Sequence, residues 1–268
     1  MKILLEICVD TIESAVAAIE GGADRIELCS ALSEGGLTPT VGLLRAVKTF
    51  LIEWSKNTGC IVPVYCMVRC RRGSDFQYSQ SEMDIMLWDV KLLKDNGSDG
   101  FVFGALDESG KVHRSQCVQV VEAVNATEGT LPLTFHRAID CTDKNKLRAN
   151  LELIAELGFT TILTSGLKPS AMEGMDTIAQ MRDISEEIKK EKGITIEIMP
   201  GSGVTPENVR MILSNTGCHA IHGSASVSKS SSNPNGGISM GSTNVDALPL
   251  KVCSKDKVAE LRRYINEI

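Results

Sequence analysis

Short apolar runs alternate along this chain with longer stretches in which apolar residues recur at the spacing of one helix face. Such short runs, bounded by turn residues, are typical of buried strands, and the amphipathic stretches between them are typical of helices. The pattern predicts eight strands, which are Ile3–Val9, Arg25–Cys29, Val62–Val68, Gly100–Gly104, Leu131–His136, Thr161–Thr164, Ile194–Met199 and Ala220–Gly223.

The order of these elements predicts the fold. Strands that alternate with helices form repeated βα units, and such units place their strands parallel in one sheet. Eight parallel strands close into a barrel without an exposed sheet edge, and a length of 268 residues suits one such barrel. We therefore expect an α/β fold, a single (β/α)8 TIM barrel, with residues 1–268 in one domain.

Local signals predict several helix boundaries. Asp10 followed by Glu13 resembles a capping box for a helix that reaches Gly21. Threonine before proline is typical of a helix start, because proline is tolerated at the first helical position. The remaining signals are Thr38-Pro39, Thr205-Pro206 and a left-handed Gly97 after a helix over Ser81–Asn96.

Composition narrows the functional classes. Hydrophobic residues make up 43% of the chain, enough for one sizeable core, and the formal net charge is -6. An acidic surface repels a phosphate backbone, so we expect no nucleic-acid partner. We expect no membrane span, since no apolar run approaches the roughly 20 residues required, and no signal peptide. Nine cysteines at irregular spacing predict a reduced cytoplasmic protein, with the nucleus as a further location.

Alternation of side chains along the first two strands places charged residues inside the barrel. The inward-facing set should comprise Glu6, Cys8, Arg25, Glu27 and Cys29. Charged side chains inside a barrel are costly unless they are paired, and we expect Arg25 to lie between Glu6 and Glu27. The arrangement is either a structural ion pair or a carboxylate–arginine site, and its place near the strand ends favours a site.

Further polar residues stand where strands end, which is the face of a barrel that carries active sites. Arg69 closes the third strand, and His136 and Arg137 close the fifth, with Asp140 just beyond. His222 lies in the eighth strand. A lone histidine is either a hydrogen-bonded core residue or a functional group. The neighbours of His136 favour a function, and for His222 both interpretations stand.

Two segments rich in small residues resemble anion-binding loops. One follows the seventh strand and the other ends the eighth. Glycine-rich backbone beside helix N-termini binds anions, and barrels often place phosphate sites after these two strands. The alternative is that the small residues only make tight turns. The candidate residues are Gly201, Ser202, Gly203, His222, Gly223 and Ser224.

Cys8 and Cys29 occupy corresponding positions near the ends of neighbouring strands. Neighbouring strands lie about 4.8 Å apart, so two thiols at one level could share a soft ion such as Cu(I). The alternative is that both are small buried hydrophobic residues, and the spacing alone favours this interpretation.

The segment Ser228–Val245 is rich in serine, glycine and asparagine and is too long for an ordinary connection. It follows the eighth strand, at the face where barrels carry their sites. It is therefore either a surface loop or a lid over the barrel mouth.

Many of these residues lie in stretches that resemble the CutC copper homeostasis family. The stretches are EICVD (6–10), GGADRIELCSALSEGGLTPT (21–40), DGFVFGAL (99–106), TFHRAID (134–140), ILTSG (162–166), MPGSGV (199–204) and IHGSAS (221–226). Two departures from the family pattern are Cys70 in place of proline within MVRCRRGSDF (67–76) and Ser202 in place of glycine.

The resemblance implies a (β/α)8 barrel that forms a cytosolic homo-oligomer, a dimer or tetramer, with a role in copper handling. It implies Cu(I) ligation by Cys8 and Cys29. It also implies a polar cluster in the barrel mouth made of Glu6, Arg25, Glu27, Arg69, His136 and Arg137.

Two functions from different classes follow. The first is a copper homeostasis protein that binds Cu(I) through Cys8 and Cys29. The second is an enzyme acting on a small anionic metabolite, phosphorylated or not. In that enzyme His136 or a carboxylate is the general acid–base, and Arg69 with the loop after the seventh strand holds the anion. A copper carrier needs the cysteines, the enzyme needs His136, and a scaffold acting through oligomer surfaces needs neither.

Overall fold

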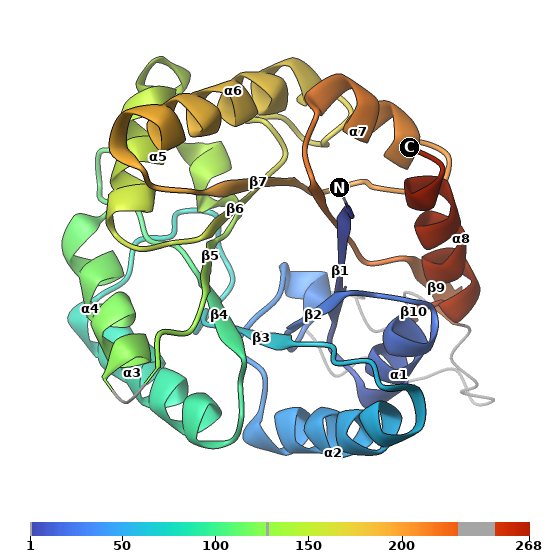
Figure 1. Cartoon of the computed structure of the whole chain (residues 1–268). Helices are drawn as coiled ribbons and strands as arrows, with labels where there is room; N and C mark the ends of the chain where they lie inside the picture. The colour runs from blue at the N-terminus through green and yellow to red at the C-terminus, as the bar shows by residue number, and fades with distance from the viewer. Residues whose placement is uncertain (1, 127–128, 230–249) are drawn as a thin grey trace, which may run out of the picture.

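Eight parallel strands form a nearly closed barrel at the centre of the computed structural model (Figure 1). The structure describes residues 2–126, 129–229 and 250–268. The strands are β1 (Leu4–Val9), β2 (Arg25–Leu28), β3 (Val64–Met67), β4 (Gly100–Phe103), β5 (Leu133–Phe135), β6 (Thr161–Thr164), β7 (Glu197–Pro200) and β8 (Ala220–Gly223). Each strand from β1 to β6 pairs with the next along the chain, and β8 pairs with β1. The order of strands confirms the predicted barrel.

Helices surround the strands in a ring (Figure 1). They are α1 (Ile12–Glu20), α2 (Val41–Thr58), α3 (Gln80–Asp95), α4 (Arg114–Asn125), α5 (Leu147–Glu156), α6 (Met175–Lys192), α7 (Val209–Thr216) and α8 (Lys255–Asn266). Among the described residues, no helix combines the length and the apolar character that crossing a membrane requires.

The main hydrophobic core lies between the strands and the helices. Ile26 and Leu28 of β2 are fully buried in it, as are Phe101 and Phe103 of β4. Residues at the alternate positions face the barrel axis, because side chains of a strand point to opposite sides. Apolar side chains there form two smaller clusters, one of Cys29, Tyr65, Met67 and Val102 and one of Leu163, Met199 and Ala220.

Two predicted helix starts are displaced by one or two residues. Thr11 caps α1 by accepting a hydrogen bond from the Ser14 amide, so the prediction of an Asp10 cap is wrong. Thr40 caps α2, and not Thr38. The earlier residue is engaged elsewhere, because the Thr38 hydroxyl bonds the backbone of Arg69. Short polar side chains near a helix start compete for different backbone partners, and sequence alone does not decide which one wins.

Of two further predicted helix boundaries, one is wrong and one is confirmed. The start expected at Thr205-Pro206 is wrong, since α7 begins at Val209 and the Thr205 amide donates to Asn208 Oδ1 at 2.9 Å. The end expected near Gly97 is confirmed, because α3 ends at Asp95 and Gly97 adopts a left-handed φ of 91°.

A short hairpin follows the barrel. Its strands are β9 (Ser226–Lys229) and β10 (Leu250–Cys253), which pair antiparallel. The segment 228–245 that was expected to be a loop or lid therefore begins inside β9. The rest of that segment lies outside the described residues.

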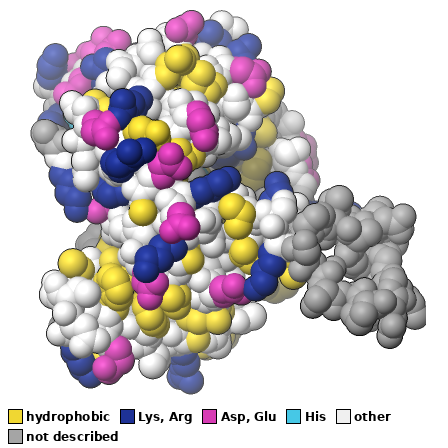
Figure 2. Space-filling view, turned by 90° about the vertical axis from the view of Figure 1, so that its right-hand side faces the viewer, with side chains coloured by type: hydrophobic (Ala, Val, Ile, Leu, Met, Phe, Trp, Pro, Cys, Tyr) yellow, Lys and Arg dark blue, Asp and Glu magenta, His cyan; other side chains and the backbone are white. Residues whose placement is uncertain are grey.

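Charged side chains of both signs are interspersed on the face of the molecule that carries α8 (Figure 2). Lys255 pairs with Glu20 at 3.0 Å, and Arg262 pairs with Asp24. On this face the acidic net charge is therefore not gathered into a single-sign patch.

Backbone strain is concentrated at the carboxyl ends of the strands. Non-glycine residues with left-handed φ angles follow β2, β3, β6, β7 and β8. Such residues persist only where the surrounding structure holds them, and they are common at functional sites. This end of the barrel is called the barrel mouth below. The strained residues are Ala31 (47°), Phe76 (50°), Leu167 (60°), Ser202 (79°) and Ala225 (45°).

Replacing Gly174→Ala tests how tightly the loop after β6 is packed. A Cβ at Gly174 would collide with the backbone carbonyl of Ser165. Because backbone atoms cannot move aside cheaply, we expect the free energy of unfolding to fall by more than about 2 kcal/mol. Gly42→Ala in α2 is the control, since its nearest atom would be 3.9 Å away. That change should leave stability unchanged or raise it by up to about 1 kcal/mol. Urea unfolding measures both, and similar values for the two would contradict this account.

Candidate functional site in the barrel mouth

Strand register brings the inward-facing polar residues of β1, β2 and β8 together. Glu6 of β1 lies opposite Arg25 of β2 and opposite His222 of β8. One step toward the mouth, Cys8 lies opposite Glu27. No more than 8% of the surface is exposed in any of Glu6, Arg25, Glu27 and His222. Cys8 is partly exposed. The mouth therefore holds a compact polar cluster, called the Glu6 cluster below.

Glu6 is the centre of the cluster. One carboxylate oxygen accepts a hydrogen bond from Arg25 Nε at 2.5 Å, and the other lies 2.7 Å from His222 Nδ1. Burial by itself would raise the pKa of this carboxyl. The neighbouring Arg25 guanidinium and His222 outweigh it and lower the pKa of Glu6 to about 2. Glu6 is therefore ionised at neutral pH although no part of it is exposed.

Arg25 is held on three sides. Besides Glu6, its guanidinium lies 4.5 Å from the centre of the Tyr65 ring and 3.4 Å from the Met199 sulfur. The expectation that Arg25 lies between Glu6 and Glu27 is wrong in its second half, because the polar contacts of Glu27 are with other residues.

Glu27 is buried and incompletely paired. Its Oε2 atom lies 3.5 Å from Cys29 Sγ and 3.9 Å from His222 Nε2. Its Oε1 atom has no hydrogen-bond partner among the described residues. Burial, together with the charge of Glu6, raises the pKa of Glu27 above its usual range, although His222 acts in the opposite direction. A buried carboxylate oxygen without a partner is unusual in a folded protein and is open to a proton or a cation.

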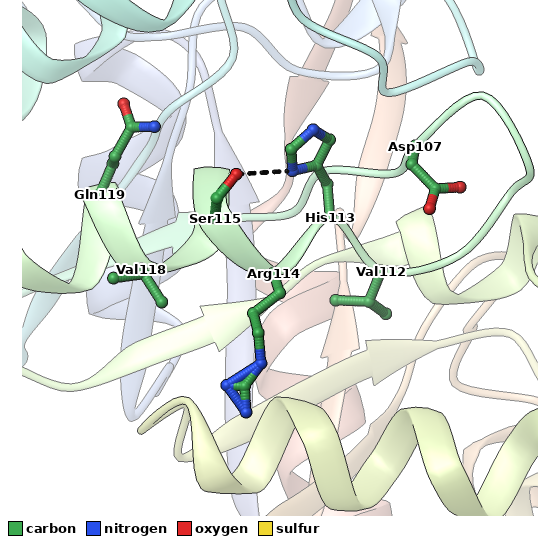
Figure 3. A pocket seen from close by; sticks show the side chains of 7 residues that line it. All are labelled: Asp107, Val112, His113, Arg114, Ser115, Val118 and Gln119. Atoms are coloured by element: carbon green, nitrogen blue, oxygen red, sulfur yellow. Dashed lines mark hydrogen bonds between the residues drawn. The ribbon is translucent and has the colours of Figure 1, made fainter.

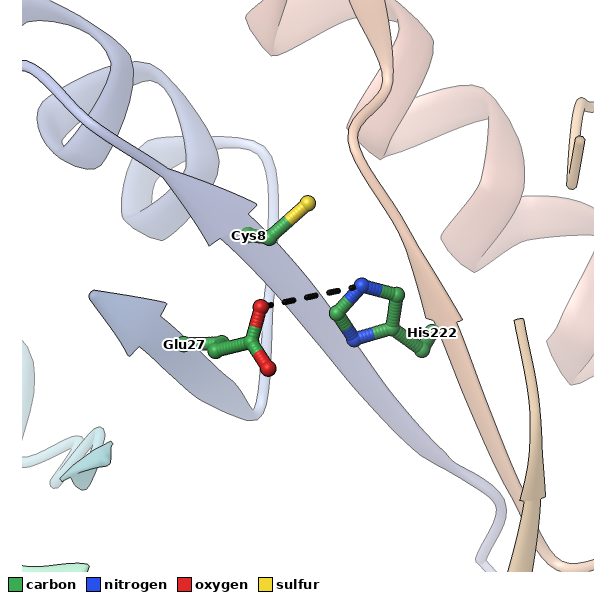
Figure 4. A group of neighbouring side chains, drawn as sticks. All are labelled: Cys8, Glu27 and His222. Carbon is green, nitrogen blue, oxygen red and sulfur yellow. Dashed lines mark ion pairs between the residues drawn. The ribbon is translucent and has the colours of Figure 1, made fainter. Parts of the chain in front are cut away.

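Glu27 and His222 face each other, and Cys8 lies beside them (Figure 4). One potential ligand atom from each lies within 4.8 Å of the others. Burial alone would lower the pKa of His222. The adjacent Cys8, the charge of Glu27 and the hydrogen bond with Glu6 together raise the pKa of His222 well above its ordinary value.

Cys29 lies beyond this group rather than level with Cys8. The prediction that the two thiols share one level is wrong, because Cys8 is opposite Glu27 and the Cys29 amide bonds the carbonyl of Val9. Cys29 is fully buried and packs beside Gly36, and burial raises the pKa of its thiol well above the usual value. Strand alternation predicts the side of the sheet on which a residue lies. The stagger between two strands cannot be predicted from the sequence of either strand alone.

Arg69 is buried at the mouth but bonds backbone instead of the cluster. Its guanidinium donates to the carbonyls of Glu34, Gly36 and Gly73 at 3.2, 3.1 and 2.6 Å. These carbonyls belong to the loops after β2 and β3. Arg69 therefore joins two loops of the barrel mouth.

His136 lies at the end of β5 with its ring 4.9 Å from that of Phe76. Its Nδ1 accepts a hydrogen bond from the Ala138 amide at 3.2 Å. Burial, with the charge of Arg69, lowers the pKa of His136 to about 3, so the ring is neutral at physiological pH. Its Nε2 has no hydrogen-bond partner within the described part of the chain.

Arg137 belongs to a separate network around Asp140. It donates to Asp140 at 2.9 Å and to the Ser165 hydroxyl at 2.8 Å. The same carboxylate accepts hydrogen bonds from the Thr164 hydroxyl and from the Ser165 and Leu167 amides. Asp140 thus fixes the strained loop after β6. Arg137 pairs with Asp140 while 41% of its own side chain is exposed.

The glycines proposed for anion binding have packing roles. A Cβ at Gly201 would lie 2.6 Å from Leu163 Cδ1 and 3.3 Å from the His222 side chain. Gly201 therefore makes room for His222, itself one of the residues expected at the anion site. Gly223 pairs with Ile7 in the β1–β8 ladder. Closure of a barrel makes its first and last strands neighbours, and this was the signal that could have linked His222 to Glu6.

The hydroxyls proposed for the same anion site have partners within their own loops. Ser202 donates to the Pro169 carbonyl at 2.9 Å, and Ser224 bonds the Ser226 hydroxyl at 3.3 Å. Gly203 adopts a left-handed φ of 71°, as a tight turn requires. The contacts of these residues are those of turn residues.

An open hollow of about 720 Å³ lies beside the N-terminus of α4 (Figure 3). His113 caps that helix by accepting a hydrogen bond from the Gln116 amide. The histidine in this hollow therefore has a structural explanation, and the hollow is outside the Glu6 cluster. It is lined by Asp107, Val112, His113, Arg114, Ser115, Val118 and Gln119.

Replacing Glu6→Gln leaves the buried Arg25 guanidinium without its carboxylate. We expect the free energy of unfolding at neutral pH to fall by about 3 kcal/mol. Glu13→Gln is a matched control, because it removes a carboxylate that pairs with Lys229 at 2.9 Å while 62% exposed. That change should cost less than about 1 kcal/mol. Equilibrium urea unfolding compares the two, and equal losses would show that Glu6 is not the centre described here.

The pH dependence gives a second check on Glu6. Its pKa is lowered in the folded chain from an ordinary 4.5 to about 2, so it stabilises the fold fully above pH 4.5. That contribution is lost progressively as the pH falls toward about 2. The stability gap between the wild type and Glu6→Gln should therefore narrow over this window in urea titrations. A gap that stayed constant would contradict the assignment.

The sequence of this chain is similar to the sequences of known proteins. The CutC family profile matches residues 3–227. A copper homeostasis protein cutC homolog from Drosophila melanogaster is 46% identical over 223 residues, which cover 83% of this chain and 77% of that protein. The copper homeostasis protein cutC homolog of Homo sapiens is 40% identical over 268 residues, which cover 99% of this chain and 90% of that protein.

Solved structures agree with the sequence comparison. A CutC structure from Streptococcus agalactiae has a TM-score of 0.73 at 29% identity and covers 83% of this chain and 98% of its own. Phosphoribosyl anthranilate isomerase from Thermotoga maritima has a TM-score of 0.57 at 13% identity, with 99% and 100% of the two chains covered, and shares the fold alone. The family profile and the relatives establish that this chain belongs to the CutC family.

Proposed function

We propose that this chain acts in copper homeostasis by binding Cu(I) in the barrel mouth. The observation that carries the proposal is the convergence of Cys8, Glu27 and His222, whose ligand atoms lie within 4.8 Å of one another. Thiolate is the ligand that soft Cu(I) prefers, and imidazole also suits copper. The names of the relatives, which refer to copper homeostasis, favour the same ion.

Cys8 and His222 are the principal ligands in this proposal. The Nδ1 atom of His222 is engaged by Glu6 at 2.7 Å, which leaves Nε2 to face Cys8 and Glu27. A carboxylate that fixes the far nitrogen of a ligating histidine is a recurrent feature of metal sites. Cys29, the second thiol expected from the sequence, lies 3.5 Å from Glu27 and is the candidate for an additional ligand.

The alternative function is an enzyme acting on a small anionic metabolite, with His136 or a carboxylate as the general acid–base. Arg69 and the loop after β7 would hold the anion. Arg69 directs its donors at loop carbonyls, and burial keeps His136 neutral. The contacts of Arg69 do not favour a bound anion, and neither do those of His136. Copper binding is therefore the better supported of the two functions. A cytoplasmic location and assembly into a dimer or tetramer stay predictions from the sequence.

Replacing Cys8→Ser should abolish stoichiometric Cu(I) binding, because it removes the thiolate that anchors the ion. The wild type should bind about one equivalent, and His222→Gln should weaken binding by at least about tenfold. Anaerobic competition with a chromophoric Cu(I) chelator measures both.

Cys60→Ser is the control for that experiment, because Cys60 is exposed and lies outside the cluster. It should bind copper as the wild type does. Unchanged affinity and stoichiometry in Cys8→Ser would refute the proposed site. Cys29→Ala distinguishes the ligand sets, since a loss equal to that of Cys8→Ser would indicate a two-thiol site.

A further inference from the structure

Helix α3 carries an apolar stripe on its outer surface. Ile85, Trp88 and Leu92 are 55%, 62% and 46% exposed, so nothing in the described part of the chain covers them. Their spacing of three and four residues places them on one face of the helix. α3 lies in the outer ring between α2 and α4, and its opposite face packs on the core through Met83 and Met86 (Figure 1). The stripe therefore faces outward from the barrel.

The composition of this surface is typical of an interface. Single apolar residues scattered over a surface need no explanation, whereas apolar residues gathered on one face mark an interaction site. Tryptophan is enriched at the centres of protein interfaces, where burial of its large ring contributes much of the binding energy. An open hollow of about 390 Å³ lies along the same helix. It is lined by Asp84, Leu87, Trp88 and Lys91, which together with Ile85 and Leu92 are called the Trp88 face below.

The charges of the Trp88 face are placed symmetrically about its centre. Asp84 lies three residues before Leu87, and Lys91 lies three residues after Trp88. A two-fold axis through the middle of the Leu87–Trp88 pair exchanges position 84 with 91 and position 87 with 88. Two antiparallel copies of α3 would therefore place Asp84 of each copy beside Lys91 of the other. Parallel copies would instead place like charges together.

We propose that the Trp88 face binds the same face of a second copy of this chain, with the two α3 helices antiparallel. Leu87 and Trp88 of both copies form the apolar centre, and Asp84 pairs with Lys91 at each end. A closed two-fold contact uses the same patch on both copies, so the patch must complement itself. The order of one acidic, two apolar and one basic residue along this stripe meets that requirement.

Both charges are available for pairing between copies. Asp84 accepts a hydrogen bond at 2.8 Å from Gln80 of the same helix, which is a neutral side chain. Lys91 Nζ lies 5.1 Å from the centre of the Trp88 ring, and that contact leaves its charge without a carboxylate. Exposed ion pairs at an interface determine register and specificity more than affinity. The apolar centre therefore supplies the binding energy, and the charges select the antiparallel arrangement.

The size of the face determines how strong the dimer is. α3 has 16 residues, which make it about 24 Å long and about 10 Å across. One helix face of this size is smaller than the roughly 800 Å² that each partner buries in a standard stable interface. We therefore expect a dimer that dissociates on dilution in the micromolar range.

Sedimentation velocity of the full chain, free of copper, between about 1 and 200 µM measures the assembly. The wild type should change from monomer to dimer over this range, and Trp88→Glu should stay monomeric. If the wild type forms a tetramer, Trp88→Glu should halve its mass. A wild type that is monomeric throughout would overturn the proposal, and so would an assembly that Trp88→Glu leaves intact.

Ile61→Glu is the matched control, because it makes the same kind of change elsewhere on the surface. Ile61 is 87% exposed and lies just before β3, outside the Trp88 face. This variant should assemble as the wild type does. Equal loss of assembly in Ile61→Glu and Trp88→Glu would show that the effect does not belong to α3.

Charge reversals test the antiparallel register. Asp84→Lys and Lys91→Asp each place like charges beside one another at both ends of the contact, so each should weaken the dimer at least about tenfold. The double variant again has opposite charges at both ends and should recover the dimer. Both positions are exposed, and circular dichroism reports whether the fold is kept. A double variant that assembles no better than either single variant would overturn the antiparallel arrangement.

This inference is independent of the copper proposal. The Trp88 face lies on the outer ring, whereas the Glu6 cluster lies inside the barrel mouth. Trp88→Glu should therefore bind Cu(I) as the wild type does, and Cys8→Ser should form the dimer. Absence of assembly in a chain that binds Cu(I) would overturn this inference alone, and absence of copper binding in a chain that dimerises would overturn the other alone.

Discussion

The polar centre of this barrel depends on one buried carboxylate. Glu6 is ionised and fully buried, and it bonds Arg25 with one oxygen and His222 with the other. An unpaired charge inside a barrel would cost several kcal/mol, so these three residues are stable there only as a set. The set also orients His222, and that orientation gives Cys8 and Glu27 a nitrogen to face. The geometry of the mouth follows from that pairing.

The sequence predicted which residues face the axis but not which of them meet. Strand alternation alone placed Glu6, Cys8, Arg25, Glu27 and Cys29 inside, and the structure has them there. It could not supply the stagger between β1 and β2, which sets Cys8 opposite Glu27 and leaves Cys29 two residues beyond. Contacts across a closed barrel depend on register and closure, which are properties of the whole sheet.

Charged residues at the mouth divide into two groups that no sequence pattern separates. Arg69 is buried and Asp140 is partly buried, and both bond the backbone of loops. Each holds a loop that contains a strained residue, Phe76 or Leu167. Strain of this kind persists only where such bonds maintain it. Arginine and aspartate at strand ends thus support the rim of the mouth, while an arginine and two glutamates on β1 and β2 form its polar centre.

Charge balance explains how one cluster can suit both a proton and a monovalent metal ion. The buried set carries Arg25 and a readily protonated His222 against Glu6 and a carboxyl whose pKa is raised. Binding of Cu(I) to Cys8 and His222 would release protons from those groups, since metal ligands must be deprotonated. Cu(I) then brings its positive charge to ligands that have lost protons, so the ion does not enter the cluster as an uncompensated buried charge, whose desolvation penalty would be large. A site built around Glu6 is therefore suited both to protons and to Cu(I) for a single electrostatic reason.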